Sequence, residues 1–170
     1  MGIRTTREMF VYELGRTRNL ERMGDRMLSE IADRIQDPEL PCMLHDEEDA
    51  RHRLAANFDS CLRSLGISPT EVDAPVVEAL RQRFHTFARM GPSPEALNLY
   101  ALGTALRLAY TVIAGYKELV DLAQILGEHE CERCLQENLT HKEQYATRLQ
   151  RDGQDIRKRL IMDPASAVSR

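Results

Sequence analysis

Residues 93–127 read SPEALNLYALGTALRLAYTVIAGYKELVDLAQILG and indicate the central helix of the protein. Ser93 and Pro94 are residues that start helices, and Gly127 is a residue that ends them. Between them, apolar side chains recur on most faces of the helix at residues 97, 99, 102, 105, 106, 109, 112, 113, 116 and 120. A helix that is apolar on most sides is expected in the centre of a bundle. We therefore expect the other helices to pack around residues 94–126.

Spacings of three and four residues predict four further helices, at about 6–36, 38–65, 75–89 and 128–160. Thr5 and Glu8 form a capping box for the first, Asp37 and Pro38 separate it from the second, and Gly66 ends the second. Short turns make each pair of long helices antiparallel, and the 27 residues from 67 to 93 join the two pairs. We predict an all-α four-helix bundle of two antiparallel hairpins, with a long crossover that contains a short helix. It forms one domain over 1–162, followed by a flexible tail at 163–170.

Composition excludes several classes of protein. The chain has 170 residues, 42% of them hydrophobic and none of them Trp, so its core is aliphatic. A net charge of −4 argues against nonspecific nucleic-acid binding. There is no run of 18 apolar residues and no apolar signal region near the N-terminus, so we expect no membrane span and a cytoplasmic location. Four cysteines are then expected as reduced thiols.

A set of short motifs in both hairpins suggests a family. It comprises Glu13-Leu14, Leu20-Glu21, Pro38-Glu39-Leu40 through to Leu65-Gly66, Tyr116, Leu122-Ala123, Leu126-Gly127, Leu135, Leu139 and Leu149. In these motifs and their gapless spacing, residues 8–155 resemble the YciE/YciF-type family of bacterial ferritin-like stress proteins. The resemblance implies a ferritin-like bundle, a homodimer and a role in stress responses.

The same resemblance implies a di-iron centre, but most of its ligand positions carry no ligand here. The acid of the first helix is present as Glu21. The remaining positions fall on residues that cannot serve, namely Ala50, Leu54, Ala109, Val112, Lys142 and Ala146. Residues 96–117 contain no Asp, Glu, His or Cys, which removes the ligands of one whole helix. We therefore expect a degenerate di-iron site without a cofactor, and the sequence leans against an enzyme.

Charged residues at the depth of that site suggest a different core. Glu21, Glu47, Arg51 and Lys142 fall on or beside the inward stripes of three helices. An unpaired charge buried in a helical bundle lowers the stability of the fold, whereas a buried ion pair is tolerated. We predict a neutral ion-pair network with a contact between Glu21 and Lys142. This favours a structural or interaction protein.

Two alternatives stay open at this point. In another register, an iron or other divalent-metal site of an oxidase or iron-handling protein would use Glu21, Asp49, His52, Glu137 and His141. Small residues at Ala50, Ala109 and Ala146 would otherwise leave a cavity for a small molecule, unless Phe58 and Tyr110 fill it.

Cysteines and tyrosines are the remaining candidates. Cys61, at the end of the second long helix, is expected near Cys131 and Cys134 of the last one, with Cys134 as its neighbour. The alternatives there are a redox pair or a zinc site, and structural cysteines are favoured. The tyrosines of the central helix, Tyr100, Tyr110 and Tyr116, are expected as core aromatics with hydroxyls at the bundle edge.

Overall fold

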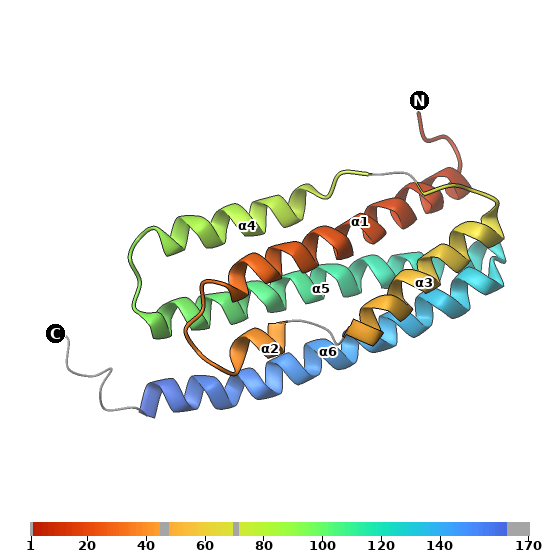
Figure 1. Ribbon diagram of the computed structural model, residues 1–170. Coiled ribbons are helices and arrows are strands. Elements are labelled where there is room, and N and C mark those ends of the chain that lie inside the picture. The colour runs from red at the N-terminus through yellow and green to blue at the C-terminus, as the bar shows by residue number, and fades with distance from the viewer. Residues whose placement is uncertain (1, 45–47, 70–71, 163–170) are drawn as a thin grey trace.

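The computed structural model describes residues 2–44, 48–69 and 72–162, and the side chains at 48, 49 and 160–162 are not described. In this part of the chain all regular structure is helical, in the order α1 (Thr6–Ala32), α2 (Leu40–Leu44), α3 (Glu48–Leu65), α4 (Pro75–Ala88), α5 (Pro94–Leu126) and α6 (His129–Met162). Figure 1 shows the helices running side by side along one long axis. The all-α class is confirmed. The tail at 163–170 lies outside the described residues.

Helix α5 is the centre of the protein, as its apolar sequence predicts. It packs most extensively on α6, then on α1, and it also contacts α4 and α2. Its inward residues, among them Leu102, Leu119 and Ala123, are fully buried. By length and composition alone, α5 is long and apolar enough to cross a membrane. Half of its most apolar segment is buried against the rest of the protein.

Local signals in the sequence place the helix ends. The Thr5 hydroxyl accepts a hydrogen bond from the Glu8 backbone N–H, and the Glu8 carboxylate accepts one from the Thr5 N–H, which completes the capping box. Hydrogen bonds from the backbone N–H groups of Arg4 and Thr5 to the carboxylate lower the pKa of Glu8. Ser93 caps α5 through the N–H of Ala96, and Gly127 ends it in the left-handed conformation with φ 70°.

The first hairpin differs from the prediction in two ways. Helix α1 ends at Ala32 instead of residue 36, and the helix expected at 38–65 is found as α2 and α3, with residues 45–47 outside the described part. Proline disfavours the helical conformation of the residue before it, so α1 cannot continue into Pro38. Asp37 instead accepts hydrogen bonds from the N–H groups of Glu39 and Leu40, and α2 starts at Leu40 rather than at Pro38.

We expect Thr5→Ala to lower the free energy of unfolding by about 1 kcal/mol, because it leaves the Glu8 N–H without its cap. The matched control is Thr6→Ala, which changes the next residue in the same way without touching a cap. Urea denaturation followed by circular dichroism measures both. Equal effects of the two changes would contradict the capping role of Thr5.

Candidate functional site

An ion pair in the interior joins the first and last helices. Lys142 Nζ of α6 lies 2.9 Å from Glu21 Oε2 of α1, and the two side chains are only 9% and 20% exposed. The other carboxylate oxygen, Oε1, accepts a hydrogen bond of 2.8 Å from the hydroxyl of Tyr116 on α5. The structure therefore brings Glu21 and Lys142 together, and Tyr116 holds the same carboxylate from a third helix.

A buried amide extends these contacts to a fourth helix. The side-chain N–H₂ group of Asn138 on α6 donates to the Tyr116 hydroxyl and to the backbone carbonyl of Leu54 on α3, both at 3.2 Å. Its carbonyl oxygen accepts from Asn57 on α3 at 2.8 Å. Asn138 is completely buried, so all of its bonds are made inside the protein. We call Glu21, Tyr116, Asn138 and Lys142 the polar core.

Helical spacing explains how these residues come to face inward. Glu21 lies four residues after the buried Thr17 and three before the buried Gly24 of α1. Lys142 lies between the buried Leu139 and Ala146 on α6. Asn138 was not predicted from the sequence, although it lies four residues before Lys142 on the same inward face of the helix. Tyr116 was predicted as a core residue, but its hydroxyl lies at the centre of the bundle and not at the edge.

The other predicted members of the network lie elsewhere. Arg51 Nη1 is 3.1 Å from Asp25 Oδ2, and both side chains are about two-fifths exposed, at 41% and 38%. Arg51 therefore belongs to a surface ion pair, one helical turn along α1 from Glu21. The reason is that α3 packs mainly on α6 and only lightly on α1. Glu47 lies outside the described residues.

The alternative metal ligands are not gathered in one place in the described residues. Within them, no group of three or more His, Cys, Asp or Glu side chains has the arrangement of a metal site. Glu137 is exposed and lies 3.8 Å from Arg133, and His52 is exposed on α3. His141 is half-buried, and the side chain of Asp49 is not described.

The side chains that the structure describes around Glu21 do not fit a dinuclear iron centre. Such a centre needs several carboxylates and imidazoles that converge from different helices. Here both oxygens of Glu21 already accept bonds, one from a lysine ammonium and one from a tyrosine hydroxyl. On the α5 side the neighbouring cavity is lined by Ala109 and Val112, which offer no ligand atoms.

A cavity of about 260 Å³ lies beside the polar core, between α1, α3 and α5. The sequence predicts a cavity between three alanines, and only one of them, Ala109, lines this one. Ala50 borders a separate pocket with His141, and Ala146 is buried among core side chains. Phe58 forms part of the wall, whereas Tyr110 is half exposed and leaves the space open.

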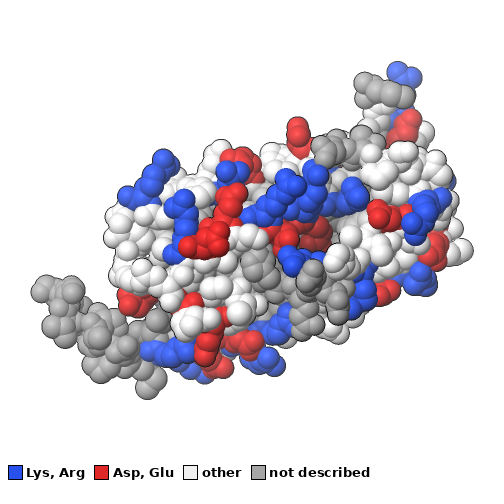
Figure 2. Space-filling model, in the orientation of Figure 1, with Lys and Arg blue, Asp and Glu red and all other residues white. Residues whose placement is uncertain are grey.

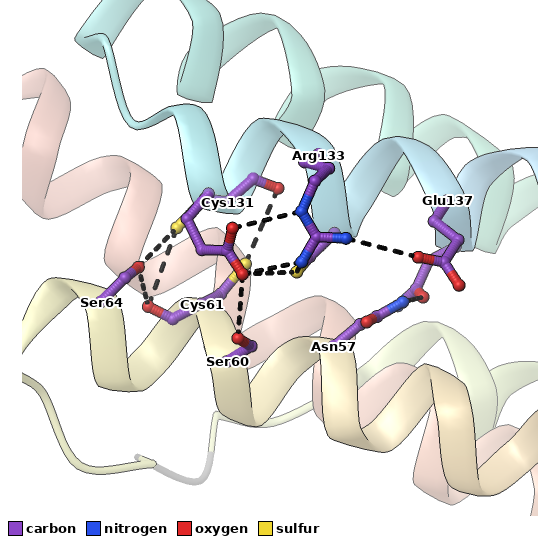
Figure 3. A network of polar contacts seen from close by, with 10 residues as sticks. Asn57, Ser60, Cys61, Ser64, Cys131, Arg133 and Glu137 are labelled. Atoms are coloured by element: carbon purple, nitrogen blue, oxygen red, sulfur yellow. Dashed lines mark hydrogen bonds and ion pairs between the residues drawn. The ribbon is translucent and has the colours of Figure 1, made fainter.

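Two cysteine thiols meet where the end of α3 packs on the start of α6 (Figure 3). Cys61 and Cys131 each donate a thiol hydrogen bond of 3.7 Å to the other's backbone carbonyl, and Ser64 Oγ lies 3.5 Å from Cys131 Sγ. The sequence suggested Cys134 as the neighbour of Cys61, and that prediction is wrong. The partner of Cys61 is Cys131. Cys134 instead contacts Glu130 and Arg133. All four cysteines of the chain are free thiols.

The thiols of this cluster have shifted acidities. The interaction between the Cys61 and Cys131 side chains lowers the pKa of Cys131 to about 7 and raises that of Cys61, which burial raises further. Burial also raises the pKa of Cys134. Arg133 and Ser60 hold the pKa of Glu130 at about 2, so the cluster has a fixed negative charge beside it. Cys61, Cys131 and Cys134 are completely buried, which is typical of structural cysteines.

Comparison with known proteins agrees with this architecture. A family model described as "Domain of unknown function (DUF892)" matches residues 5–158. No curated protein matches the chain. The solved structure of the Escherichia coli stress protein YciF is similar with a TM-score of 0.83 and 18% identity, over 92% of this chain and 99% of that one. YcfI of Rhodopseudomonas palustris, provisionally named a structural protein, has a TM-score of 0.80 and 20% identity, over 87% and 94%.

These likenesses establish the fold and confirm the YciF-type resemblance that the motifs of the two hairpins predict.

We expect Lys142→Met to lower the free energy of unfolding by about 3 kcal/mol, because it leaves the Glu21 carboxylate buried without its cation. The double variant Glu21→Leu with Lys142→Met removes both charges and should regain most of that loss. Arg51→Met, which breaks an exposed pair, should cost less than about 1 kcal/mol. Urea titrations of the three variants test this. A double variant no more stable than Lys142→Met alone would contradict it.

We expect one fast-reacting thiol per native chain with Ellman's reagent, and four after unfolding in guanidinium. Cys42 is exposed and the other three cysteines are buried. Cys42→Ser should therefore abolish the fast phase. Rapid reaction of further thiols in the folded variant would show that the Cys61–Cys131 cluster opens to solvent.

Proposed function

We propose that this chain, which belongs to the DUF892 family, is a non-catalytic, stress-related structural protein of ferritin-like build. In this proposal the interior that holds a di-iron centre in ferritin-like proteins is occupied by the polar core. The printed descriptions of the two similar structures, a stress protein and a provisionally named structural protein, support the role.

The observation that carries the proposal is the Lys142 ammonium, 2.9 Å from the Glu21 carboxylate inside the bundle. A fixed cation at that distance neutralises the carboxylate and repels an incoming metal cation. Tyr116 occupies the second oxygen, so Glu21 is satisfied as it stands. Together with the absence of acids and histidines from residues 96–117, this supports the loss of the di-iron ligands.

The ferritin-like connectivity is part of the same proposal. It has two antiparallel hairpins, one from α1 to α3 and one from α5 to α6, and a crossover that contains α4. The tight turn at Gly127 and the extensive packing of α5 on α6 support the second hairpin. The light contact between α1 and α3 makes the first hairpin the more open of the two.

Cytoplasmic location and a homodimer complete the proposal. Four free cysteines, three of them buried, suit a reducing compartment. The dimer is proposed on the family resemblance, and light scattering after size exclusion should then give twice the chain mass of 19.5 kDa. A particle of single-chain mass would contradict the dimer and leave the structural role to a monomer.

The deciding experiment is elemental analysis of protein purified from cells grown with added iron. We expect metal far below the two ions per chain of a dinuclear centre, and no acceleration of Fe(II) oxidation over buffer. Glu21→Gln is the matched variant, and its metal content should equal that of the wild type. A ferritin-type di-iron protein carried through the same purification controls for metal loss.

A wild-type chain with close to two irons, lost in Glu21→Gln, would overturn the proposal and favour an iron oxidase or iron-handling protein. If the iron is instead lost in His52→Ala or His141→Ala, the site is the alternative one, formed by Glu21, Asp49, His52, Glu137 and His141.

A further inference from the structure

One face of the central helix is not covered by the rest of the described chain. Helix α5 contacts α1, α4 and α6. Gly115 lies close to Thr17 of α1, and Lys117 Nζ lies 3.0 Å from Glu143 of α6. Between these contacts runs a row of residues at spacings of three and four, which we call the outer face of α5. It consists of Gly103, Arg107, Tyr110, Ala114, Lys117, Asp121 and Ile125, and all of them except Gly103 are exposed.

The outer face of α5 leaves large apolar side chains in solvent. Tyr110 is 51% exposed and Ile125 is 74% exposed. Half of the most apolar segment of α5 is not buried within the chain. By contrast, Figure 2 shows basic and acidic side chains close together over the face on which α1 and α3 lie. Exposed apolar and aromatic side chains gathered on one helix face are typical of a surface that packs on another protein.

The charges of the outer face are arranged symmetrically about Ala114. Arg107 lies seven residues before Ala114, and Asp121 lies seven residues after it. In the described part of the chain, neither of these two side chains forms an ion pair. Lys117 is neutralised by Glu143, whereas Glu118 adds a second acid beside Asp121. The face is therefore basic toward the start of α5 and acidic toward its end.

We propose that the outer face of α5 binds the same face of a second copy of this chain, with the two helices antiparallel and a twofold axis at Ala114. In this arrangement Arg107 of each copy faces Asp121 of the other, and two ion pairs form. In a parallel arrangement each charge would face its own counterpart and repel it. The inference rests on the homodimer of the proposed function and names its interface.

The sizes of the side chains suit the same arrangement. Ala114 is small, so two α5 helices can approach to about 8 to 10 Å between their axes. Gly103 and Ile125 each lie eleven residues from Ala114, so Ile125 of one copy lies opposite Gly103 of the other. From Gly103 to Ile125 the face is about 33 Å long at 1.5 Å per residue. This length suits an interface that buries roughly 800 Å² per copy.

Disulfide cross-linking at Ala114 tests the position of the axis. In a Cys42→Ser background, Ala114→Cys places one exposed thiol of each copy at the axis, and mild oxidation should join the two copies. Ala56→Cys, on the exposed surface of α3, is the matched control. On a non-reducing gel we expect most of the Ala114→Cys chain, and little of the control, at twice the chain mass.

Charge reversal tests the register. Arg107→Asp places two acids opposite each other on both sides of the axis and should raise the dissociation constant of the dimer about tenfold. The double variant Arg107→Asp with Asp121→Arg restores both ion pairs and should dimerise like the wild type. Arg63→Asp makes the same change on the exposed surface of α3 and should have no effect. Sedimentation velocity over a range of protein concentrations measures all three.

The outcomes separate this interface from the dimer itself. A wild-type dimer in which Ala114→Cys cross-links no faster than Ala56→Cys would overturn the interface and leave the homodimer in place. A double variant that dimerises as weakly as Arg107→Asp alone would overturn the antiparallel pairing. A wild-type particle of single-chain mass would overturn the homodimer and this interface together, and leave the outer face to a different partner. Circular dichroism of each variant shows whether a loss of dimer is a loss of fold.

Discussion

The contact of Lys142 with Glu21 ties together helices from opposite ends of the chain. It joins α1 to α6 at 2.9 Å. Tyr116 of α5 bonds to the same carboxylate, and Asn138 links Tyr116 to the backbone of α3. In a low-dielectric interior, each of these polar groups would be costly if its partner moved away. The polar core therefore fixes the relative register of four helices, which an aliphatic core of interchangeable leucines and alanines specifies less sharply.

The same contact sets what the interior can do chemically. A carboxylate that faces an ammonium and a hydroxyl is neutralised in place, and both of its oxygens already accept bonds. The space that remains lies to one side, between α1 and α3, and most of its lining is apolar. A structural role is compatible with this interior, and α5 carries no Asp, Glu, His or Cys from 96 to 117.

Much of the fold could be predicted because its signals are local. The Thr5–Glu8 capping box, Ser93-Pro94 and Gly127 act within one helical turn, and α5 lies at the residues that the sequence predicts. The start of α2 at Leu40 was missed, because it depends on the hydrogen bonds of the Asp37 carboxylate to the N–H groups of Glu39 and Leu40. The early end of α1 at Ala32 was missed as well. In the site, the contact between Glu21 and Lys142 was predicted because helical periodicity places both residues on inward faces. Asn138 was missed because a neutral amide on an inward face does not by itself indicate a polar contact.

By itself, the sequence determined the helical class, the central place of residues 94–126 and the inward direction of Glu21 and Lys142, because helical periodicity decides which side of a helix is buried. Only the tertiary structure decided the partners. Arg51 reaches Asp25, Cys61 meets Cys131, and Tyr116 turns its hydroxyl to Glu21. These pairings depend on the distance between α3 and α1 and on the register of α3 along α6. Both are set by the packing of all side chains together.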